Sequence, residues 1–153
     1  MWQPDWARRD MTNLYIVPPT RFQEQEFLTY QLLPAAAVVD WRKEFLGTLR
    51  PKQRRLGLSV AGELERLRRI GNSAQRVFSI INTEYFLARF TARELEQFWL
   101  ALWSDFPHLT GIILFCTLDT PALLPDKLDL ENWLNDGRLF SVETLNPSGA
   151  PRK

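Results

Sequence analysis

Short apolar runs alternate with longer amphipathic stretches along this chain. Five of the runs have the length and the residue types of buried strands, at residues 14–17, 36–39, 77–81, 111–118 and 139–142. Between most of them lie stretches whose apolar residues recur at helical spacing. Because alternating strands and helices build βαβ units, we predict an α/β fold. The architecture expected is a three-layer sandwich around a mostly parallel sheet of about five strands.

Capping signals accompany the helical periodicity. Thr20 and Thr91 are each followed three residues later by Gln or Glu, which is capping-box spacing. A stretch that begins at Ser59 has its acidic residue near the start and its arginines near the end, the order that the helix macrodipole favours. The predicted helices cover residues 21–33, 41–49, 59–71, 91–103 and 128–134.

The chain of 153 residues has the size of one domain. We predict an N-terminal arm (1–12), a single α/β domain (13–145) and a flexible tail (146–153). No apolar stretch approaches the ~20 residues of a membrane span, and the start of the chain has no signal-peptide pattern. The single cysteine, Cys116, excludes an intramolecular disulfide. A cytoplasmic protein without a membrane partner is expected.

Charge is uneven although the net charge is only +1. Residues 42–76 carry ten basic and three acidic groups, whereas the segments on either side are acidic. Such a segment indicates a surface for an anion or an acidic partner. Leu and Gly, rather than aromatic residues, separate its charges, so a solvated helix face, a protein partner and nucleic acid all remain open. The candidate contact residues are Arg50, Lys52, Arg54, Arg55, Arg66, Arg68 and Arg69.

In parallel sheets, ligands bind beyond the carboxyl ends of the strands. The turn after the first strand reads PPTRFQE, without the glycines and the lysine of a phosphate-binding loop. After the third strand, Ile81 occupies the position of a metal-binding carboxylate, and Glu84 either activates a water or serves as a local cap. Asp40, Glu84 and Asp119 together could hold a metal at this rim. With one histidine and one cysteine, neither a catalytic triad nor a His/Cys metal cluster can be assembled, so no cofactor and no catalytic residue is predicted.

The order of these segments resembles a minimal P-loop ATPase core. It is similar to the small P-loop proteins of bacterial BREX-type phage-exclusion systems, in which an apolar strand precedes Asp-Asn-x-Glu. Here Asn82-Thr83-Glu84 matches the end of that motif and Ile81 replaces its aspartate, so the Walker B carboxylate is absent, as is the Walker A loop. The resemblance implies a P-loop NTPase-like fold over about residues 14–142 that has lost ATP hydrolysis.

The same resemblance assigns positions to further residues. Thr117 stands where such folds carry a polar sensor on the fourth strand, and Arg138 precedes the last strand, where a trans-acting arginine would lie. Asn82, Glu84, Thr117 and Asp119 therefore form a candidate vestigial rim.

Our leading interpretation is a non-catalytic protein-interaction or scaffold subunit of a multi-protein assembly, with phage defence as its implied setting. Six tryptophans favour an interface, and the candidates are Trp2, Trp6 and Trp133. One alternative is an accessory protein that binds nucleic acid through the basic segment. The other is a divergent nucleotide-binding, ATPase-like protein.

Overall fold

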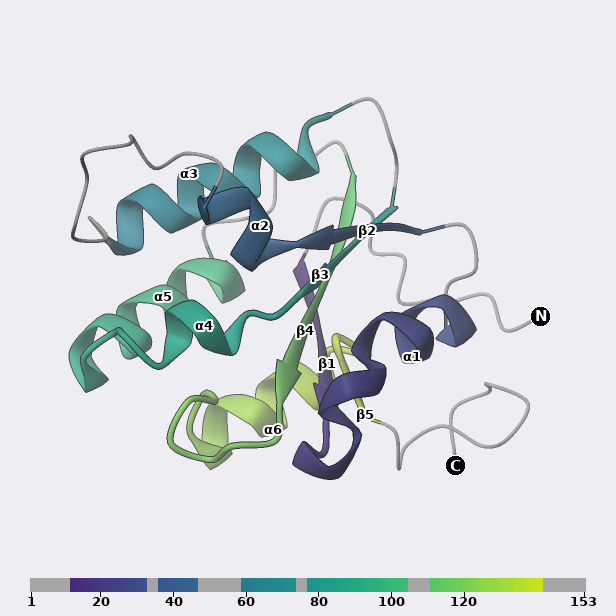
Figure 1. Ribbon diagram of the computed structural model, residues 1–153. Helices are drawn as coiled ribbons and strands as arrows, with labels where there is room; N and C mark the ends of the chain where they lie inside the picture. The colour runs from purple at the N-terminus through teal and green to yellow at the C-terminus, as the bar shows by residue number, and fades with distance from the viewer. Residues whose placement is uncertain (1–11, 33–35, 47–58, 74–76, 105–110, 142–153) are drawn as a thin grey trace.

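A five-stranded parallel sheet forms the centre of the molecule (Figure 1). The computed structural model describes residues 12–32, 36–46, 59–73, 77–104 and 111–141. Its strands lie in the order β2-β3-β4-β1-β5, and every neighbouring pair is parallel. They are β1 (Thr12–Val17), β2 (Ala37–Asp40), β3 (Val77–Ile81), β4 (Ile112–Leu118) and β5 (Leu139–Ser141). The predicted α/β class and the parallel five-stranded sheet are confirmed.

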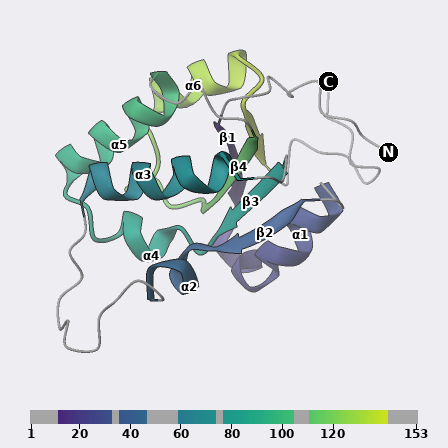
Figure 2. The same cartoon turned by 90° about the horizontal axis from the view of Figure 1, so that it is seen from above.

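Helices cover both faces of the sheet unequally (Figure 2). In the described part of the chain they are the 3-10 helix η1 (Pro19–Glu24), α1 (Gln25–Leu32), α2 (Trp41–Leu46), α3 (Val60–Gly71), α4 (Glu84–Leu87), α5 (Ala92–Ser104) and α6 (Lys127–Asn135). Residues of α3, α5 and α6 pack into one core cluster, whereas α1 contributes to a second cluster on the opposite face. None of these helices is long and apolar enough to pass through a bilayer.

Local capping determines where two of the helices begin. The Thr91 hydroxyl accepts from the Glu94 N–H and the Glu94 carboxylate accepts from the Thr91 N–H, at 3.2 and 2.9 Å, so the predicted capping box is confirmed. Ser59 caps α3 by accepting from Gly62 N. The prediction for Thr20 was wrong. Two prolines start a 3-10 turn there, with no side-chain cap, and the α-helix begins only at Gln25.

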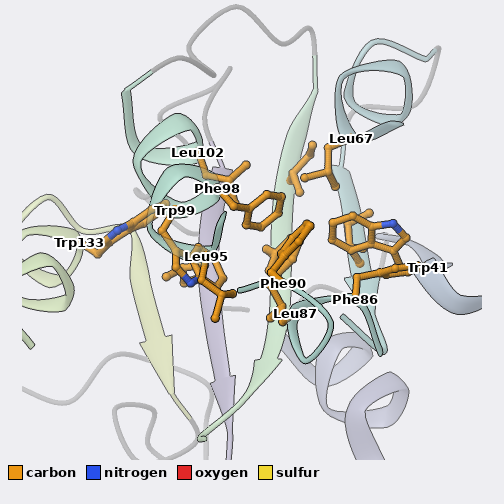
Figure 3. Packing of buried hydrophobic residues seen from close by; sticks show 14 of the residues in the cluster. Trp41, Leu67, Phe86, Leu87, Phe90, Leu95, Phe98, Trp99, Leu102 and Trp133 are labelled. Atoms are coloured by element: carbon orange, nitrogen blue, oxygen red, sulfur yellow. The ribbon is translucent and has the colours of Figure 1, made fainter. Parts of the chain in front are cut away.

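The larger core lies between the sheet and the helices α3 to α6 (Figure 3). Aromatic rings dominate it: Phe98 of α5 contacts the rings of Trp41, Phe90 and Phe115 at centroid separations of 6.1, 5.5 and 5.9 Å. Such tilted pairs add to the free energy gained by burying the rings. The wide apolar face predicted for this helix is therefore buried against the sheet, as its spacing requires.

The smaller core lies under α1 on the other face. It joins Leu28 and Leu32 to Ile81 and Cys116 at the strands. Cys116 is fully buried, and burial raises the pKa of its thiol far above the ordinary value. The thiol therefore behaves as a small apolar group rather than as a nucleophile.

Candidate functional site

The carboxyl ends of β1 and β4 form a topological switch point of the sheet. These strands are neighbours, yet β1 continues into α1 on one face of the sheet and β4 leads to α6 on the other (Figure 2). A crevice at such a switch point is where open α/β sheets bind their ligands. The resemblance to a P-loop core places the phosphate-binding turn at the same location, directly after β1.

Backbone donors are scarce at this turn. Pro18 and Pro19 have no N–H, and the Arg21 N–H donates to the Pro18 carbonyl at 2.9 Å. On the facing strand, the Asp119 N–H donates to the Val17 carbonyl at 2.8 Å. A phosphate-binding turn needs several N–H groups directed at the anion; here the two prolines have none and the N–H groups of Arg21 and Asp119 are already used.

The cationic side chain at the turn is also engaged. The Arg21 guanidinium donates to both carboxylate oxygens of Glu24, from Nε at 2.9 Å and from Nη2 at 3.1 Å. A bidentate pair of this kind satisfies the planar edge that an anion would otherwise occupy. Arg21 therefore serves the local structure of η1.

Gln25 contacts the corner after β3. Asn82 has a φ of 60°, a left-handed conformation that asparagine tolerates better than most residues. Its N–H donates to the Gln25 Oε1 at 3.3 Å, and the Gln25 Nε2 donates to the Phe22 carbonyl at 3.0 Å. Ile81, immediately before this corner, is 7% exposed and belongs to the smaller core. The Ile81 side chain is thus used for packing.

Glu84, directly after the same corner, has a partly buried carboxyl group. Burial raises the pKa of its carboxyl above the ordinary value, and the negative charge of Asp40 raises it further. A hydrogen bond with Gln25 acts in the opposite direction. Its Oε2 is buried without a hydrogen-bond partner in the described part of the chain. The structure therefore brings Asn82 and Glu84 together around Gln25, a residue that sequence reasoning did not single out.

The other two predicted rim residues, Thr117 and Asp119, have surroundings that differ from those of Asn82 and Glu84. Thr117 is fully buried, and its hydroxyl has no hydrogen-bond partner among the described residues. Asp119 is exposed. No group of three or more potential metal ligands occurs among the described residues, so the carboxylates of Asp40, Glu84 and Asp119 do not converge as a metal site requires.

Three of the basic candidates lie on α3, and their surroundings differ. Arg68 pairs with Glu65 at 3.1 Å. Arg66 lies 3.5 Å from Glu63 and donates to the Glu44 carbonyl. Arg69 is exposed and makes no ion pair with a described residue. The remaining four candidates, Arg50, Lys52, Arg54 and Arg55, lie outside the described residues.

Arg66 and Arg69 line an open pocket of about 320 Å³ between α3 and the edge of the sheet. Its lining combines apolar side chains with two arginines, one glutamate and one serine. The complete lining is Val39, Glu44, Arg66, Arg69, Ile70, Ser73 and Phe78. This pocket is the one that two of the predicted basic residues line.

The prediction of a surface role for Trp133 is corrected by its burial. Trp133 is 1% exposed, and its ring packs against Trp103 at a centroid separation of 5.2 Å. The chain folds α6 back onto α5, and burying this indole is what joins the two helices. Trp2 and Trp6 lie outside the described residues.

Arg138 is also a structural residue, not a trans-acting one. It is 2% exposed, and its guanidinium lies over the faces of Trp103 and Trp133, 4.7 and 4.4 Å from their centroids. It donates to the carbonyls of Thr12, Leu102 and Trp103. The side chain connects β1 to the end of α5, so it does not reach into a neighbouring subunit.

A buried polar pair near the pocket was not foreseen from the sequence. The indole N–H of Trp41 donates to a carboxylate oxygen of Glu63 at 2.6 Å, and neither residue is more than 2% exposed. Burial raises the pKa of Glu63, while Arg66 and the bond from Trp41 act to lower it. Helix position alone indicated Glu63 as a macrodipole residue; no signal in the sequence paired it with a tryptophan 22 residues earlier.

The described residues thus offer three features: a switch point where backbone donors are scarce, the partly buried carboxyl of Glu84, and the pocket lined by Arg66 and Arg69. Comparisons of the chain with protein families, with curated proteins and with solved structures each find no match. These three features are the structural basis for a function.

Proposed function

We propose that this protein is a non-catalytic α/β subunit that works by binding other proteins in a larger assembly. The observation that carries the proposal is the closed switch point. The turn after β1 contains two prolines, and the Asp119 and Arg21 N–H groups donate to carbonyls of the protein itself. A nucleotide at this place would find neither the backbone donors nor the free cation that hold its phosphates.

The strand order supports an origin in a P-loop-like core. β4 lies between β1 and β3. The three strand ends to which the resemblance assigns the phosphate turn, the sensor and the metal-binding carboxylate are therefore neighbours. Rossmann and flavodoxin-like sheets have other orders, 3-2-1-4-5-6 and 2-1-3-4-5. The likeness to small BREX-type proteins suggests phage defence as the setting of the assembly.

Two measurements test the proposal together. The first is thermal unfolding with millimolar ATP or ADP, with and without Mg²⁺, since any ligand that binds only the native state raises the midpoint. We expect no shift. The second is chemical cross-linking and co-purification of the tagged protein from its own host, with mass determination of the complex. We expect defined protein partners to remain bound through size-exclusion chromatography. A nucleotide-dependent shift, or a chain that stays monomeric without partners, would contradict the proposal.

Nucleic-acid binding is the second candidate, and the arginines of α3 are the observation in its favour. A phosphate-dominated interaction weakens steeply as salt rises, because bound counterions are released. Arg68→Glu together with Arg69→Glu on α3 should then abolish retention of a labelled oligonucleotide. Retention that is unchanged by these substitutions would remove this candidate.

A further inference from the structure

We propose that the edge of β2 and the pocket beside it form a docking surface for an extended acidic segment of a partner protein. This inference rests on the proposed function, because it names the surface through which a protein partner is held. Its starting point is the position of β2, which is one of the two edge strands of the sheet and pairs only with β3 among the described strands. An exposed edge strand presents unpaired N–H and C=O groups to solvent.

The described residues of this edge strand are not buried. All four residues of β2 are partly exposed. Four residues of strand extend about 13 Å, enough for a short peptide to add as a sixth strand by main-chain hydrogen bonds. In that mode of recognition, pockets beside the edge select the side chains of the peptide.

The adjacent pocket has the composition that would select an acidic side chain with an apolar neighbour. Its volume of about 320 Å³ lies at the small end of the range for ligand pockets. Val39 of the edge strand and Ile70 of α3, both partly exposed, provide the apolar contact. Arg69, exposed and without an ion pair to a described residue, provides the charge that a carboxylate on the peptide would meet.

Nucleic acid fits this surface less well. Arg68 is shared with Glu65 and lies outside the pocket lining. The apolar part of the lining offers aliphatic side chains and one buried phenylalanine, which cannot stack on a base because Phe78 is only 4% exposed. A protein segment can pair its main chain with the strand edge and contact the apolar lining residues, whereas a polyanion uses neither.

Selection from a displayed library of random octapeptides tests the chemistry even while the partner is unidentified. On the wild-type protein we expect enrichment of sequences that alternate Asp or Glu with apolar residues. The affinity of the best synthetic peptide is then measured by fluorescence anisotropy for wild type, Arg69→Glu and Arg68→Glu. The two variants carry the same charge change on neighbouring exposed positions of α3, so Arg68→Glu is the matched control.

We expect Arg69→Glu to weaken the peptide by about tenfold or more and Arg68→Glu by less than about threefold. Hydrogen exchange of the backbone amides of Ala37–Asp40 should slow when the peptide binds, since some of them become hydrogen bonded. Circular dichroism confirms that both variants remain folded.

Several results would overturn the inference. They are a library without acidic enrichment, equal losses in the two variants, and unchanged exchange along β2. Displacement of the peptide by a single-stranded oligonucleotide that binds more tightly would assign the surface to nucleic acid instead. If native partners still co-purify with the Arg69→Glu variant, the proposed function stands and this surface is not the site.

Discussion

The hydrogen bond between Trp41 and Glu63 gives a sharp test of how α2 and α3 are held together. Trp41 is fully buried at the start of α2, and its N–H donates to Glu63 of α3 at 2.6 Å. Its ring also contacts Phe86 and Phe115, with centroids 5.2 and 5.1 Å away. The substitution Trp41→Phe retains an aromatic ring but removes the donor and part of the volume.

The expected cost has two parts. A hydrogen bond to a charged group contributes about 1.5 to 3 kcal/mol, and Glu63 would be left buried without this donor. The smaller ring leaves a cavity that costs about another 1 to 2 kcal/mol. The free energy of unfolding should therefore fall by about 2.5 to 5 kcal/mol, a large share of the ~5 to 15 kcal/mol typical of a domain.

A double-mutant cycle separates the two parts. In a Glu63→Met background the acceptor is gone, so Trp41→Phe should cost less by about 1.5 to 3 kcal/mol. Urea unfolding followed by far-UV circular dichroism measures all four proteins without relying on the tryptophan signal. If the two substitutions are additive to within ~0.5 kcal/mol, the hydrogen bond contributes nothing and the reasoning fails.

Three further predictions concern the rim, the sheet and one helix end. Arg138→Lys should lower the free energy of unfolding by about 2 to 4 kcal/mol, because an ammonium cannot contact three carbonyls and two indole faces at once. A loss below ~1 kcal/mol, measured by urea unfolding, would contradict this. The pKa of Glu84 is raised in the fold, so the native state binds more protons than the unfolded chain and stability falls as pH rises from the ordinary glutamate pKa of 4.5 through the raised value. Glu84→Gln should remove that part of the slope and be the more stable protein above it, and superimposable curves of Tm against pH for the two proteins would disprove the assignment. Thr91→Ala should cost about 1 kcal/mol through loss of the capping box, and an unchanged Tm would show that the cap is dispensable.

Local patterns in the sequence were enough to predict most of the strands and helices and the ends of several of them. The apolar runs at β3 and β4 predict those strands because their burial depends mainly on their own composition. The start of α5 follows from Thr91 and Glu94, which interact across three residues. The failure at Thr20 has a local cause as well, since the two preceding prolines impose a 3-10 turn that outweighs the capping pattern. The short helix α4 was missed because four residues carry too little periodicity.

The candidate site was foreseen only in part, because its side chains meet across long separations in sequence. From the residues alone we could predict a turn with two prolines after the first strand and an apolar residue, Ile81, at the end of the third. The contact between Gln25 and Asn82 spans 57 residues, and that between Arg138 and Thr12 spans 126. No periodicity records such pairings, since they depend on the order of the strands.

By itself, then, the sequence determined which stretches become strands and helices and which chemical motifs are missing. Tertiary structure alone decided that β2 lies at an edge of the described sheet. It also decided that Arg69 rather than Arg68 faces the pocket beside that edge. These two arginines are adjacent in the chain and chemically identical. What separates them is the packing of α3 on the sheet, which turns one residue toward the pocket and leaves its neighbour paired with Glu65.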